Sequence, residues 1–162
     1  MDRHPVREGI IAGIIGATSV AVWFFIVDLV SGRLFFTPVT LGRALLSVLG
    51  PERDASILVP IAAYTVFHYA VFIIIGIVVA YVLRAAETEP SVLVGLLILF
   101  VAFELGFYGL TALLSEGSLF GSVAWYQIGA ANLVAALMMG RYLWRGHPRA
   151  GARLRDALAG HE

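Results

Sequence analysis

Four long apolar stretches, separated by short polar segments, constrain this 162-residue chain more than any other feature of its sequence. They cover residues 9–30, 57–83, 91–114 and 119–144. At about 1.5 Å per residue, a helix over each stretch crosses a hydrocarbon core of roughly 30 Å. None of the stretches alternates strictly between polar and apolar residues, which disfavours a membrane β-barrel. The pattern predicts an all-α integral membrane protein with four transmembrane helices.

The composition agrees with a chain whose first partner is the lipid bilayer. The sequence is 60% apolar and 14% charged, whereas soluble domains are typically about 25% charged. The absence of cysteine excludes disulfides, iron–sulfur clusters, thiolate zinc sites and cysteine nucleophiles. The formal net charge of zero argues against a nucleic-acid partner. All basic residues are Arg, which hints at a GC-rich bacterial source.

Short connections and the distribution of Arg predict the topology. The links at residues 84–90 and 115–118 are short, so neighbouring helices should run antiparallel as an up-down four-helix bundle. Eight Arg then fall on one side of the membrane and three on the other. The eight are Arg3, Arg7, Arg84, Arg141, Arg145, Arg149, Arg153 and Arg155, and the three are Arg33, Arg43 and Arg53. Cytoplasmic segments retain the basic excess, so both termini should be cytoplasmic, in a bacterial inner membrane.

This topology divides the chain into two parts. Residues 1–145 form one transmembrane domain, and residues 146–162 form a short basic cytoplasmic tail. The first extracytoplasmic loop also has a pattern of its own. Pro38 suits the first turn of a helix with Thr37 as its N-cap, and Gly50 and Pro51 would end that helix. We expect a short amphipathic helix that lies on the outer membrane surface, caps the bundle, or does both.

Small residues recur at intervals of four in the apolar stretches. Examples are Gly9 with Gly13, and Gly76 with Ala80. Because lipid tails are as apolar as leucine, membrane helices associate through close packing at such positions and through hydrogen bonds. These positions can serve either the bundle itself or a dimer.

A few polar residues interrupt the apolar stretches, although each ionisable group costs roughly 2.5–3.5 kcal/mol in the bilayer core. From their depth in the predicted spans, several should lie at overlapping levels in the outer half of the bundle. These residues are Tyr64, His68, Glu104, Tyr108, Gln127 and Asn132. Asp28 lies near the outer end of the first span. It should form an interfacial salt bridge with Arg33 or Arg43, or else contribute to the mouth of the cluster.

The predicted cluster has both functional and structural interpretations. His68 and Glu104 could pass a proton between them, or could hold a metal through imidazole and carboxylate ligands. Alternatively, Glu104 could hydrogen-bond to Asn132 or His68 and simply determine which helices pair. The sequence identifies no cofactor.

Two classes of function fit these features. The first is a small non-enzymatic accessory or assembly subunit of a membrane complex, which packs against other membrane subunits or against itself. The alternative is a transporter or binding protein that handles a proton, a metal or a small ligand through His68 and Glu104. A membrane enzyme is a weaker third option, since motifs for phosphate, dinucleotide or zinc-hydrolase chemistry are missing.

Overall fold

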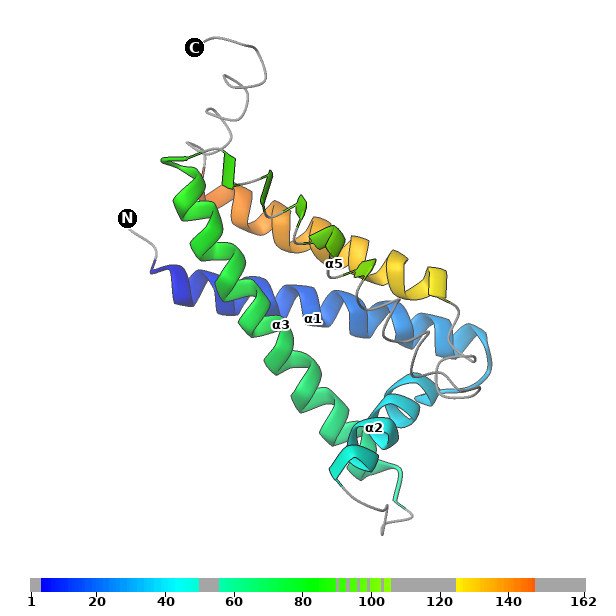
Figure 1. The fold of residues 1–162 in the computed structure, drawn as a ribbon. Helices are drawn as coiled ribbons and strands as arrows, with labels where there is room; N and C mark the ends of the chain where they lie inside the picture. The colour runs from blue at the N-terminus through cyan, green and yellow to red at the C-terminus, as the bar shows by residue number, and fades with distance from the viewer. Residues whose placement is uncertain are drawn as a thin grey trace.

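The computed structural model describes residues 4–49, 56–89 and 125–147, together with 91–92, 94–95, 97–98, 100–102 and 104–105. Every regular element within these residues is an α-helix, which confirms the all-α prediction. The helices are α1 (Pro5–Val30), α2 (Phe36–Leu49), α3 (Leu58–Ala86) and α5 (Trp125–Gly146) (Figure 1). The described residues between 91 and 105 are also helical.

Two of these helices, α1 with 26 residues and α3 with 29, are long and apolar enough to cross a membrane. Helix α1 begins earlier than its apolar stretch, with Pro5 in the first turn and Glu8 close behind. Both residues suit a helix N-terminus, where proline loses no hydrogen bond and an acid meets the positive end of the helix dipole. Helix α5 covers most of the fourth apolar stretch. Residues 106–124, where the third stretch ends and the fourth begins, lie outside the described residues.

Helix α1 is the centre of the fold, and it packs against both α3 and α5, whose backbones approach each other closely at few points. Its closest approach to α3 is between the two backbones. A Cβ atom on Gly9 would run into the backbone of Ile77, and one on Gly76 would run into Gly9 and Gly13. Such a close approach requires a residue without a side chain at each contact point, as expected for small residues between membrane helices.

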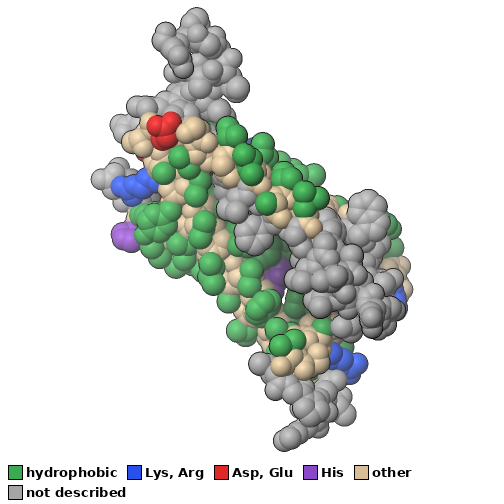
Figure 2. Space-filling model, viewed as in Figure 1, with side chains coloured by type: hydrophobic (Ala, Val, Ile, Leu, Met, Phe, Trp, Pro, Cys, Tyr) green, Lys and Arg blue, Asp and Glu red, His purple; other side chains and the backbone are tan. Residues whose placement is uncertain are grey.

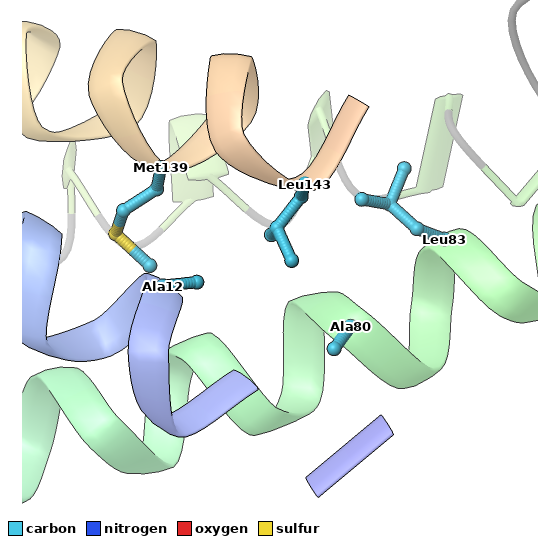
Figure 3. Packing of buried hydrophobic residues seen from close by; sticks show 5 residues of the cluster. All are labelled: Ala12, Ala80, Leu83, Met139 and Leu143. Carbon is cyan, nitrogen blue, oxygen red and sulfur yellow. The ribbon is translucent and has the colours of Figure 1, made fainter. Parts of the chain in front are cut away.

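Helix α5 packs on the neighbouring side of α1, antiparallel to it, through small and apolar side chains. One buried cluster contains Ala12, Ala80, Leu83, Met139 and Leu143 from three helices (Figure 3). A second contains Val20, Phe24, Ala131 and Ala135. The N-terminal end of α1 therefore lies beside the C-terminal ends of α3 and α5 (Figure 1). On the face seen in Figure 2, hydrophobic side chains cover the middle of the helices and charged groups lie near their ends.

Helix α2 follows a tight turn at residues 31–35, in which Gly32 and Phe35 have φ values of 67° and 62°. The helix begins at Phe36, slightly before the predicted start at Pro38. It packs against α3, where a Cβ on Gly42 would run into the backbone of Pro60. The loop helix thus exists and packs on the other helices. Its placement on a membrane surface stays a prediction.

Candidate functional site

His68 lies in α3, buried against α1. Its Nε2 atom is 3.1 Å from the carbonyl oxygen of Ala17. A carbonyl oxygen can only accept, so Nε2 carries a hydrogen and donates it. The ring of Tyr64, one turn earlier on α3, stacks on the imidazole with 5.3 Å between centroids. Phe72, one turn later, lies 4.8 Å away by the same measure. His68 therefore joins α3 to α1, and the aromatic rings of Tyr64 and Phe72 lie beside its imidazole.

Gln127 and Asn132 both lie on α5, and each contacts a different helix. The Gln127 Oε1 atom accepts a hydrogen bond of 3.1 Å from the indole Nε1–H of Trp23 in α1. The Asn132 amide donates to Glu104 Oε1 at 2.7 Å. The structure thus brings Glu104 and Asn132 together, while Gln127 pairs with α1 instead. Tyr108, the remaining member of the expected cluster, lies outside the described residues.

Five of the six candidate residues are described, and they form three separate sets of contacts: Tyr64 and His68 beside α1, Gln127 with Trp23, and Glu104 with Asn132. Among the described residues, His68 bonds to a backbone carbonyl and Glu104 bonds to Asn132, so no His68–Glu104 contact is formed there. Within the same residues, no group of three or more His, Asp and Glu side chains could hold a metal ion. The hypothesis of a metal at His68 and Glu104 gains no support from this part of the chain.

Asp28 has a role that the sequence analysis did not anticipate. It is buried at the end of α1, and both of its carboxylate oxygens accept hydrogen bonds from Thr37 in α2. The guanidinium of Arg33, one of its expected partners, lies over the ring of Phe36 at 4.2 Å from the centroid. Asp28 therefore acts at the junction of two helices.

A second polar group, which the sequence analysis missed entirely, lies where three helix ends meet. It consists of Glu8 in the first turns of α1, Glu87 just after α3, and His147 just after α5. The His147 Nδ1 atom is 2.7 Å from Glu87 Oε1, and Nε2 is 3.1 Å from Glu8 Oε2. We call these three residues the end triad.

The end triad is enclosed more tightly on one side than on the other. The Glu8 and His147 side chains are 2% and 11% exposed, while that of Glu87 is 28% exposed. The second Glu8 oxygen, Oε1, is buried with no hydrogen-bond partner. Gly146 lies against this oxygen, because a Cβ at position 146 would run into it. Glu8 is therefore confined, whereas Glu87 can reach water.

The register of the antiparallel helices explains why the end triad forms. Gly16 on α1 lies beside Met139 on α5, so two turns towards the N-terminus of α1 correspond to two turns towards the C-terminus of α5. That step brings Glu8 next to His147. The sequence did hold a signal, because all three residues flank apolar stretches at the end that an up-down bundle brings together.

Both ring nitrogens of His147 face carboxylate oxygens, and this geometry restricts how protons are shared. A neutral imidazole has one N–H and one bare lone pair. Two good hydrogen bonds therefore need a second proton, either on the ring or on one of the carboxyl groups. The end triad can thus hold one proton more than a neutral histidine between two carboxylates.

Comparison with protein-family models, with curated proteins and with solved structures finds no match to this chain.

Proposed function

We propose that this chain is a four-span protein of a bacterial inner membrane that serves as a non-enzymatic accessory or assembly subunit of a membrane complex. The exposure of its two long apolar helices supports a lipid environment. Only 33% of the most apolar stretch of α1 and 22% of that of α3 are buried. The core helix of a soluble protein would be mostly buried, whereas lipid-facing side chains need no cover.

The arrangement of charges supports an orientation with both chain ends in the cytoplasm. Arg7 on α1, Arg84 on α3, and Arg141 and Arg145 on α5 all lie towards the end where the end triad forms. Arg33 and the N-terminal half of α2 lie at the other end. Cytoplasmic sides of membrane proteins carry the excess of Arg. A reporter that is active only in the periplasm should be silent when fused after residue 162, and active when inserted near residue 53.

The observation that carries the accessory role is how the intramembrane polar groups are used. His68 bonds α3 to α1, Trp23 bonds α1 to α5, and Asn132 bonds α5 to the segment that holds Glu104. Each of these hydrogen bonds joins two different helical segments. Polar groups that pair helices determine which helices meet, and each of these groups already has its partner on another segment. This supports a structural role over the proton, metal or ligand transporter.

Reconstitution of the purified chain into liposomes with a pH gradient tests the proposal directly. We expect the gradient to decay at the rate of protein-free liposomes, and Glu104→Gln to change nothing. A faster decay in the wild-type chain that Glu104→Gln abolishes would instead establish the transporter.

The assembly role is tested in the source bacterium by deleting the chain and restoring variants at native level. We expect deletion to reduce the amount of one larger membrane complex that co-purifies with the chain. His68→Phe should restore that complex whenever the variant itself accumulates, because His68 acts only in the fold. A complex that is unchanged in the deletion strain would refute the assembly role.

A further inference from the structure

We propose that the end triad binds one exchangeable proton and that this proton controls whether the end of α3 is held to the end of α5. The position of the two His147 contacts, between the helix ends, is the first observation that supports this proposal. The backbones of α3 and α5 approach each other closely at few points, and apolar side chains such as Leu83 and Leu143 fill the space between them. The 2.7 Å contact from His147 to Glu87 is the polar link between their ends. The contact from His147 to Glu8 fastens the same ring to α1. One imidazole thus holds three helix ends.

The number of protons that His147, Glu8 and Glu87 share also supports the proposal. With two protons shared among the three groups, both N···O contacts are hydrogen bonds. This holds for an imidazolium between two carboxylates, and for a neutral imidazole that meets one carboxylic acid and one carboxylate. When one of these protons passes to water, an N–H or O–H bond breaks and no electron moves. One ring nitrogen then presents a lone pair to a carboxylate oxygen, and that contact becomes repulsive.

Burial determines which of the two contacts opens. Glu8 is almost fully enclosed, and its Oε1 atom already lacks a partner. If Glu8 also lost the donor to Oε2, a buried carboxylate would remain with no hydrogen bond, which is costly. Glu87 is partly exposed and can exchange its contact for water. Loss of the proton therefore keeps the His147–Glu8 bond and releases Glu87, so the end of α3 separates from the end of α5.

Within the described ranges, the other charged groups at this end face solvent. They are His4 and Arg7 on the α1 side, Arg84 and Glu89 on the α3 side, and Arg141 and Arg145 on α5, and each is exposed. Among the described residues, Glu8 and Glu87 are the groups that bond to His147. The proton exchange is thus assigned to these three side chains.

The distance between the two helix ends provides the test. The chain has no cysteine, so no native residue reacts with a thiol-specific spin label. Ala85→Cys and Arg145→Cys, both at exposed positions, therefore carry the only two labels. The full-length labelled protein in lipid nanodiscs is measured by pulsed electron spin resonance in steps from about pH 5 to about pH 8. We expect a short distance at low pH and a longer one at high pH, in a single transition.

One conservative variant distinguishes a proton-dependent contact between His147 and Glu87 from a contact that only stabilises the fold. In Glu87→Gln the side-chain amide can donate to a bare Nδ1 and its carbonyl can accept from Nδ1–H, so the contact no longer needs the second proton. We expect this variant to keep the short distance at every pH. Glu89→Gln, an exposed acid two residues away, is the matched control and should keep the wild-type transition. A wild-type distance that does not change with pH, or a Glu87→Gln variant that opens like the wild type, would overturn the proposal.

Discussion

The carboxylate of Asp28, near the end of α1, accepts hydrogen bonds from both the backbone N–H and the hydroxyl of Thr37 in α2, at 2.8 and 2.7 Å. The first N–H groups of a helix have no partner within the helix. A carboxylate placed there satisfies one of them and meets the positive end of the helix dipole. One helix therefore caps the next, and this contact determines how the turn between them closes.

Asp28→Ala should lower the free energy of unfolding by about 1–3 kcal/mol, because it removes a cap and a bond to a charged acceptor. Thr37→Val should cost less, since it removes the hydroxyl bond and keeps the backbone bond. Unfolding of the purified protein in detergent, followed by circular dichroism, measures both losses. Arg33→Ala is the control and should cost about 0.5–1 kcal/mol for the lost contact with Phe36. A larger loss in Arg33→Ala than in Asp28→Ala would point to an ion pair instead.

Gly13→Ala should destabilise the contact between α1 and α3 by about 1–3 kcal/mol, the usual cost of forcing extra atoms into a packed interior. The added methyl group would meet the backbone of Phe72 and Ile73, which cannot move aside as a flexible side chain can. The same exchange at Gly140 on α5 meets nothing within 4 Å. Gly140→Ala should therefore be neutral or stabilising by up to about 1 kcal/mol. Equal effects at the two positions in the same detergent unfolding assay would contradict the backbone contact.

Helix positions could be predicted from the sequence because length and hydropathy are local properties. The apolar stretches at 9–30 and 57–83 correspond closely to α1 and α3, and the loop pattern after Thr37 corresponds to α2. The packing faces also follow from residue size, since Gly9, Gly13, Gly76 and Ala80 are all buried. Small residues leave few alternatives for where two helices approach most closely.

The candidate site was harder to predict because it depends on helix rotation and on backbone partners. The carbonyl of Ala17, which accepts from His68, has no signature in the sequence. Nor does the sequence single out the hydrogen bond from the Trp23 indole to Gln127. The end triad joins residues 60 and 139 positions apart. Only the register of three packed helices brings them together.

The Glu104–Asn132 pair should respond asymmetrically to substitution. Asn132→Leu removes the donor and leaves a partly buried carboxyl group without it, whereas Glu104→Leu leaves only an uncharged amide. An uncompensated ionisable group is the more costly of the two. Asn132→Leu should therefore destabilise the protein more than Glu104→Leu, and adding Glu104→Leu should restore part of the loss. Sodium dodecyl sulfate titration of the three variants measures this order. The reverse order would show that Glu104 has other partners in the fold.

The Trp23–Gln127 hydrogen bond should contribute about 0.5–1.7 kcal/mol to the packing of α1 against α5, the range for polar contacts between membrane helices. Trp23→Phe removes the donor and keeps an aromatic ring beside the second apolar cluster, where Trp23 packs. Gln127→Leu removes the acceptor at similar volume. Each single variant also loses contacts unrelated to the bond, so the double variant is needed to isolate the coupling energy. Circular dichroism suits this cycle, because tryptophan fluorescence would change with Trp23 itself. A coupling near zero would mean that the two side chains stabilise the helices independently and that the bond does not select this pairing.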